Sequence, residues 1–152
     1  MIVKNILKAK GRIPGDGAGN VVTIGPDAAI ADAARLLWAR FIGAVVVVDC
    51  AGEIVGLLSE RDIVRGLAEG GCVDLCHTVK DLMTRNVQVC HENDNVVTLL
   101  ETMTRLRVRH LPVVDDQRKL IGIVTIGDLV KSRLDQAHLD MDNLVEYVAT
   151  VR

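Results

Sequence analysis

The chain has 152 residues, 49% of them apolar and 25% charged, which is the balance of a folded globular protein rather than a disordered one. Its net charge of −2 and its single Trp, Tyr and Phe exclude a basic nucleic-acid surface and a base-stacking platform, so we expect no nucleic-acid partner. The length is too short for a (β/α)₈ barrel of about 250 residues, and no run reaches the roughly 18 apolar residues of a membrane span.

The amino-terminal part starts with a short apolar leader over 3–7, followed by a glycine-rich segment over 11–19 that predicts a flexible loop. Gly15, Gly17 and Gly19 suggest a phosphate-binding loop, but such a loop follows a strand and opens a helix, and this segment does not. The leader is too short for a signal peptide. We therefore expect a cytoplasmic protein without a membrane partner, with its four cysteines reduced.

The segment after this loop has the pattern of a helix, a β-hairpin and a second helix. Ile30, Ala33 and Leu37 recur at the spacing of one helical face, and two apolar runs joined by a four-residue polar turn predict the hairpin. The expected bounds are 30–37 for the helix, 44–48 and 54–58 for the strands, 49–52 for the turn, and Ser59 for the start of the second helix.

The same pattern recurs 66 residues later, so that Asp49 corresponds to Asp115 and Ser59 to Thr125. With a strand before its first helix, each copy reads β-α-β-β-α. A repeat of about 50 residues is marginal alone, so we predict an α+β fold in which two repeats pack with pseudo-two-fold symmetry around a cleft. The expected units are 1–69 (leader, glycine-rich loop and repeat one), 78–136 (repeat two, with its own leader at 79–83) and 137–152 (a carboxy-terminal helix with Leu144, Val148 and Val151 on one face).

Each repeat carries a Ser/Thr-x-x-Asp motif where its last strand turns into a helix. Ser59 and Thr125 fall at the helix start, where free backbone N–H groups and the helix dipole favour a phosphate. Asp62 and Asp128 follow three residues later, and a carboxylate accepts hydrogen bonds from both hydroxyls of a ribose. The same spacing is also a helix capping box, and the two roles are compatible.

These residues resemble the cystathionine-β-synthase-like (CBS) domain pair, most of all stand-alone bacterial members. The resemblance rests on Val-Val-Val-Asp (46–49) and Leu-Pro-Val-Val-Asp (111–115), followed by Gly-Leu-Leu-Ser-Glu-Arg-Asp (56–62) and Gly-Ile-Val-Thr-Ile-Gly-Asp (122–128). It implies a regulatory module that binds AMP, ADP, ATP or NAD(H), with phosphate and ribose on Ser59, Asp62, Thr125 and Asp128. It also implies a homodimer and no catalytic cofactor.

Further ligand-binding residues follow from their positions near these motifs. Arg61, Arg109 and His110 suit phosphate recognition, whereas Arg105 and Arg107 are assigned to a solvated face. By the resemblance, the purine slot and its edge comprise Ile42, Gly43, Ala44 and Val108, with Thr23 and Val89 contributing backbone groups.

Two other functions were weighed against nucleotide sensing. Catalysis is not expected, because the sequence contains no activated nucleophile and no metal-ligand helix motif. A metal- or redox-linked scaffold or oligomerisation module using Cys72 and Cys76, with Cys90 nearby in sequence, is the alternative. Reduced structural cysteines are the simpler reading of this spacing.

Overall fold

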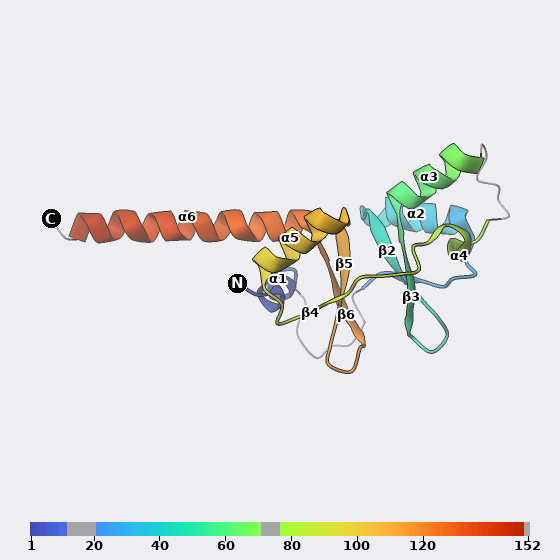
Figure 1. Cartoon of the computed structure of the whole chain (residues 1–152), viewed down its shortest axis with the longest axis horizontal. Helices are drawn as coiled ribbons and strands as arrows, with labels where there is room; N and C mark the ends of the chain where they lie inside the picture. Colours follow the sequence, from blue (N-terminus) through green and yellow to red (C-terminus); the bar gives the residue numbers. More distant parts are fainter. Residues whose placement is uncertain (12–20, 71–76, 151–152) are drawn as a thin grey trace.

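The computed structural model describes residues 1–11, 21–70 and 77–150, and contains two three-stranded sheets of the same design (Figure 1). The strands are β1 (Thr23–Ile24), β2 (Ala44–Val48) and β3 (Ile54–Ser59) in repeat one, and β4 (Cys90–His91), β5 (His110–Val114) and β6 (Leu120–Thr125) in repeat two. In each sheet the first strand runs parallel to the second and the second pairs antiparallel with the third. This confirms the predicted α+β fold of two β-α-β-β-α repeats.

The register of the hairpins places each Ser/Thr-x-x-Asp motif beside the start of the middle strand. Ser59 pairs with Ala44, and Thr125 pairs with His110. Both hairpins also carry an irregularity at the same place, near Val48 and Val114. The duplication therefore extends from the sequence to the details of backbone pairing.

Two helices flank each sheet. They are α2 (Ile30–Arg40) and α3 (Glu60–Gly70) in repeat one, and α5 (Val96–Leu106) and α6 (Ile126–Thr150) in repeat two. α2 and α5 end on residues in the left-handed conformation, Phe41 with φ of 51° and Arg107 with φ of 55°. Apolar faces of the helices and strands form one buried core in each repeat.

Each leader helix packs against the opposite repeat. α1 (Val3–Ala9) buries Val3, Ile6 and Leu7 in the core of repeat two, while α4 (Val79–Leu82) and Met83 join the core of repeat one. Backbone hydrogen bonds fix both leaders: Val3 N donates to Asp94 O at 3.1 Å, and Val79 N donates to Ala28 O at 2.9 Å. The expected unit 1–69 thus includes a leader that completes the other repeat.

The last helix is longer than the repeat requires. The second helix of repeat two and the expected tail helix form one element, α6, whose carboxy-terminal half extends away from both sheets (Figure 1). Val151, Cys72, Cys76 and the glycines at 15–19 lie outside the described residues. Among the helices of the described residues, none is long and apolar enough to cross a bilayer.

Candidate functional site

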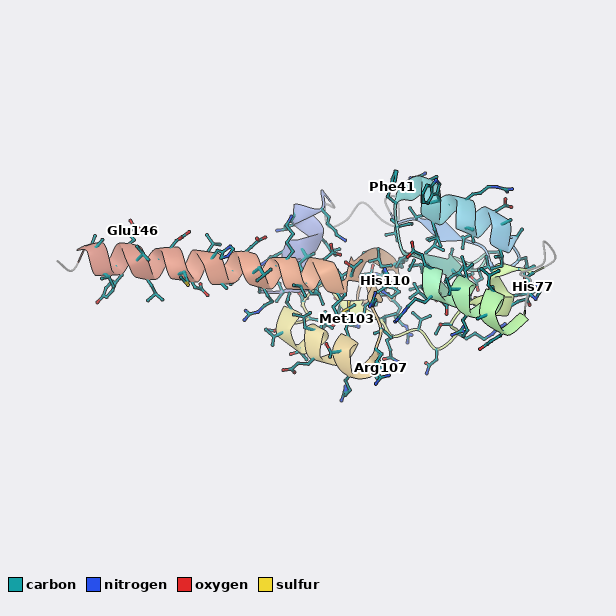
Figure 2. All side chains as sticks on the ribbon, turned by 90° about the horizontal axis from the view of Figure 1, so that it is seen from above. Phe41, His77, Met103, Arg107, His110 and Glu146 are labelled. Atoms are coloured by element: carbon teal, nitrogen blue, oxygen red, sulfur yellow. The ribbon has the colours of Figure 1, made fainter. Side chains whose placement is uncertain are left out.

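A cavity of about 220 Å³ lies between the two repeats, at the level where β3 turns into α3. Repeat one contributes the end of β3 and the start of α3, repeat two contributes the turn into β5, and the segment before β4 closes one side. The lining residues are Gly43, Leu57, Ser59, Glu60, Arg61, Asp62, Thr84, Asn86, Val87, Gln88, Arg107, Val108, Arg109, His110 and Leu111. His110 lies near the middle of the body of the molecule, between the two repeats (Figure 2).

At the cavity wall, the Ser59–Asp62 motif caps α3. Ser59 N and Ser59 Oγ donate to Asp62 Oδ2 at 2.8 and 2.9 Å, and Asp62 N donates to Ser59 Oγ at 3.3 Å. These reciprocal bonds are the capping-box geometry that the spacing allows. The capping role is therefore present in the structure, and any ligand role is additional to it.

The second oxygen of Asp62 is also engaged. Arg65 Nη2 lies 3.1 Å from Asp62 Oδ1, and Thr84 Oγ1 donates to the same oxygen at 3.4 Å. Asp62 is only 6% exposed, the sole charged residue buried to this degree among the described residues. A carboxylate accepts about four hydrogen bonds, so all of its acceptor capacity is in use, with the bond from Thr84 the longest.

Gly56 allows Thr84 to reach this position. Thr84 pairs with Leu57 through two backbone hydrogen bonds of 2.9 and 3.0 Å, which hold the segment after α4 against β3. A Cβ on Gly56 would lie 2.4 Å from Met83 Sδ and 3.2 Å from Thr84 O, so a side chain at position 56 would push this segment away. The hydrogen bond between Thr84 and Asp62 therefore depends on Gly56, the first residue of the segment 56–62 that ends in the Ser59–Asp62 motif.

Three arginines line the cavity: Arg61 at the start of α3, and Arg107 and Arg109 before β5. Guanidinium groups bind phosphate oxygens in pairs, so this wall favours a phosphate-bearing ligand. Arg107 is exposed to solvent, as predicted, and it also lines the cavity, which was not predicted. Its position follows from the left-handed residue that ends α5, which no helical periodicity predicts.

His110 contacts both repeats. Its Nε2 would lie 3.3 Å from a Cβ on Gly43, and Glu60 Oε2 would lie 3.7 Å from the same point. Burial lowers the pKa of His110 below its ordinary value, although the carboxylates of Glu60 and Asp128 act in the opposite direction. The imidazole is therefore neutral at pH 7, and a nearby anion would favour its protonation.

The second motif has the same cap but a different partner. Thr125 N donates to Asp128 Oδ2 at 2.7 Å, and Asp128 N donates to Thr125 Oγ at 3.1 Å. Lys10 Nζ, at the end of α1, donates to the same carboxylate oxygen. Burial raises the pKa of Asp128, but the hydrogen bonds from Lys10 and Thr125 outweigh it and hold that pKa below its ordinary value. Asp128 lines a separate hollow of about 290 Å³ between α1 and α6.

The structure therefore brings only part of the predicted site into one cavity. The residues together are Ser59, Arg61, Asp62, Gly43, Val108, Arg109 and His110. Ala44 is buried in β2, Ile42 packs on the core of repeat one, and Thr23 pairs with Val46. Val89 lines a different hollow with Arg85 and Arg118, and residues 86–88 take the place expected for Val89 because β4 begins only at Cys90.

Sequence reasoning missed seven further lining residues besides Arg107: Leu57, Glu60, Thr84, Asn86, Val87, Gln88 and Leu111. The correspondence of repeats offered one signal, because Asn86 and Val87 match Asn20 and Val21 at the start of the duplicated segment. Identical residues just before a first strand indicate a shared role there. No comparable signal marks Thr84.

Two cysteines lie in the described residues, Cys50 at the surface and Cys90 in the core. Burial raises the pKa of the Cys90 thiol to about 12, so it stays protonated and unreactive at neutral pH. The described residues hold no group of three or more His, Cys, Asp or Glu side chains placed to bind a metal ion. Cys72 and Cys76, on which the metal hypothesis depends, lie outside them.

Comparison with known proteins gives matches over most of the chain. A family model described as "CBS domain" matches residues 18–69 and 79–135. The crystal structure of a CBS-domain-containing protein from Agrobacterium tumefaciens is 44% identical, covers 88% of this chain and 99% of its own, and has a TM-score of 0.79. The curated relatives vary in size, and the chain spans between 20% and 71% of their lengths.

Two similar solved structures contain adenosine-based ligands. The CBS domain pair of protein MJ0100, in complex with 5-methylthioadenosine and S-adenosyl-L-methionine, is 30% identical with a TM-score of 0.72, and covers 91% of this chain and 98% of its own. A CBS domain protein from Pyrobaculum aerophilum complexed with AMP is 25% identical with a TM-score of 0.69, and covers 84% of this chain and 89% of its own.

Proposed function

The chain belongs to the CBS domain family, and we propose that it is a regulatory module that binds an adenine nucleotide, AMP, ADP, ATP or NAD(H), in the cavity between its repeats. One observation carries the proposal: three arginines and the start of α3 surround a cavity whose wall also contains the Asp62 carboxylate. Relatives with AMP or S-adenosyl-L-methionine bound support the ligand class. The proposed setting is the cytoplasm, as expected from the sequence.

In the proposed complex, the phosphate lies at the start of α3. There it contacts Arg61 of that helix and Arg109, which precedes β5. One ribose hydroxyl binds Asp62 Oδ1 and replaces the long hydrogen bond from Thr84 at 3.4 Å. The purine lies against Val108 and the backbone of residues 86–88. Because the cavity of about 220 Å³ is below the usual range of roughly 300–1,000 Å³, part of the nucleotide stays in solvent.

Such a ligand would touch both repeats at once, because the cavity wall contains residues of each. Its binding energy would then favour one relative placement of the repeats, which is the physical requirement for a switch. This is regulation by binding, without turnover of the nucleotide. Recovery of chemically intact nucleotide after long incubation with the protein is the expected outcome, and a converted nucleotide would indicate an enzyme.

We also propose that the protein is a homodimer. Large apolar side chains are exposed on helices of both repeats, with Trp38 of α2 81% exposed and a further set along α6. Exposed apolar surface of this extent is typical of an interface. Light scattering at high micromolar concentration tests the proposal, and a monomer would refute it.

Thermal unfolding tests the nucleotide proposal directly. A ligand that binds only the folded state adds about 2.7 kcal/mol at 100 times its Kd, so the best adenine nucleotide should raise the melting temperature by several degrees. Guanine nucleotides are the control and should raise it less. If no adenine nucleotide shifts the melting temperature at millimolar concentration, the proposed function is wrong. Mass spectrometry of nucleotide that co-purifies with the protein would identify the ligand.

A further inference from the structure

The carboxy-terminal half of α6 is a helix without a neighbour among the described residues. All residues from Ala137 to Thr150 are exposed, and both views show this part of α6 extending beyond the rest of the molecule (Figures 1 and 2). A lone helix of this length is marginal in water, because most helical stability in proteins comes from packing of an apolar face. This segment therefore needs a packing partner to be a stable helix.

The apolar residues of this half follow the spacing of a coiled coil. The spacings between Leu134, Ala137, Met141, Leu144 and Val148 are alternately three and four residues, and all five of these positions are apolar. A seam with a mean spacing of 3.5 residues packs against another helix of the same spacing. We call these five residues the α6 seam. A second copy of this chain carries a helix with the same spacing, and it is present at the same concentration as the first.

The area of the α6 seam suits such a pair. Its large members are between 57% and 65% exposed. At that exposure each of these four side chains presents on the order of 100 Å², so with Ala137 the seam offers roughly 450 Å² on each copy. Two copies then bury about 900 Å², close to the size of about 1,000 Å² at which specific protein interfaces begin.

We infer that the α6 seam is the contact between two copies of this chain, which pair as a two-helix coiled coil. This inference rests on the proposed homodimer and is independent of the nucleotide.

Two leucines with the same exposure test the inference. Leu134 belongs to the α6 seam and Leu139 lies away from it, yet each is 57% exposed in the single chain. In sedimentation velocity over a concentration series, Leu134→Glu should raise the dimer dissociation constant at least 100-fold, whereas Leu139→Glu should change it less than threefold. Circular dichroism and nucleotide-dependent melting check that both variants keep a folded body.

The outcomes separate this inference from the proposals it rests on. A wild-type monomer overturns both the homodimer and the seam. A wild-type dimer that Leu134→Glu leaves intact, or that both variants weaken equally, overturns the seam alone.

Discussion

The two repeats share a backbone but present different charges around their Ser/Thr-x-x-Asp motifs. At the positions that correspond across the duplication, Arg61 is matched by Gly127, Arg107 by Phe41, Arg109 by Gly43 and His110 by Ala44. Phe41 and Arg107 lie at opposite edges of the molecule with His110 between them (Figure 2). Every basic group in this set belongs to the cavity that contains Ser59.

This difference shows what duplication conserves and what it leaves free to change. Both motifs cap their helices with near-identical geometry, because the cap satisfies backbone groups that every copy of the fold exposes. The side chains around the caps do not satisfy backbone groups in this way, so they can differ between the two repeats. On the Ser59 side they form a basic wall, whereas on the Thr125 side the described residues present Lys10 alone to the carboxylate. A phosphate-bearing ligand should therefore prefer the first cavity.

The largest effect is expected from removing the carboxylate charge in the basic cavity. Asp62→Asn should lower nucleotide affinity by about 1.5–3 kcal/mol, or roughly 10- to 150-fold, because a hydrogen bond to a charged group is lost. Asp128→Asn should lower it less. Isothermal titration calorimetry measures both.

Helix capping supplies the control for this comparison. Thr78 and Asp81 form a third capping box with the same distances, 2.8 and 2.9 Å, at the start of α4 and outside the cavity. Asp81→Asn should therefore leave affinity unchanged. If the three Asn variants reduce affinity equally, or none does, Asp62 has no special role in binding.

A smaller effect is expected from exchanging the arginine between repeats. Arg61→Ala should weaken binding about tenfold, the worth of one charge-assisted hydrogen bond. Gly127→Arg should strengthen binding at the Thr125 side, and it fits because a Cβ at position 127 would meet Thr125 Oγ at 3.6 Å, an ordinary contact. Gly127→Ala is the control for the backbone change. The comparison fails if Gly127→Ala and Gly127→Arg give the same affinity and stoichiometry.

Protonation of His110 should add a pH dependence to the first cavity. Its pKa is lowered in the free protein, mainly by burial, and a bound phosphate should raise it. Nucleotide affinity should thus increase by roughly threefold as pH falls below about 6.5. The measured quantity is the ratio of wild-type to His110→Gln affinity at each pH, which cancels titration of the nucleotide itself. A ratio that is constant from pH 8 to pH 5.5 would remove His110 from the phosphate site.

The sign is opposite for folding stability. Because the folded protein binds a proton on His110 less readily than the unfolded chain does, His110 costs stability as pH falls below about 6.5. The free energy of unfolding of His110→Gln, measured without nucleotide, should therefore fall less than that of the wild type over this pH range.

The smallest effect is expected at the ion pair between Lys10 and Asp128. Both side chains are partly exposed, so Lys10→Met should lower the free energy of unfolding by only about 0.5–1 kcal/mol at pH 7. The pKa of Asp128 is held low in the folded state, so its contribution is present above the ordinary carboxyl pKa and is lost as pH falls through about 4 and below. The free energies of urea unfolding of the variant and wild type should therefore converge as pH falls well below 4. A difference that persists there would assign the loss to packing.

Much of the fold could be predicted from the sequence, because the hydrophobic periodicity and the repeat at an offset of 66 residues indicated the same elements. Strand β2 at Ala44–Val48 and strand β5 at His110–Val114 match the expected bounds, since alternating loops and apolar runs recur at a fixed offset. The Ser59 and Thr125 helix starts were found for the same reason. Local chemistry, repeated twice, was sufficient for these elements.

The rest depends on contacts between distant segments. The leaders were recognised as a pair, but nothing local indicates that Val3 packs with Val96 or that Val79 packs with Ala33. Arg107 lines the cavity because it is itself the left-handed residue that ends α5, and helical periodicity does not predict such a residue. The hydrogen bond between Thr84 and Asp62 depends on the same crossing of the chain. Sequence reasoning therefore identified the motifs but not the complete cavity.

The exchanged leaders have a consequence for the order in which the protein acquires its structure during synthesis. Repeat one cannot close its core until Val79 and Met83 have left the ribosome, although its own strands and helices end at Gly70. α1, which precedes repeat one in the chain, must wait longer, because its apolar residues share a core with residues as distant as Leu129. At about 5–20 residues per second, the roughly 120 residues between α1 and Leu129 correspond to a delay of about 6–24 s. During that interval the apolar side chains of Ile6 and Leu7 lack their core, and transiently exposed apolar surface of this kind favours aggregation or chaperone binding.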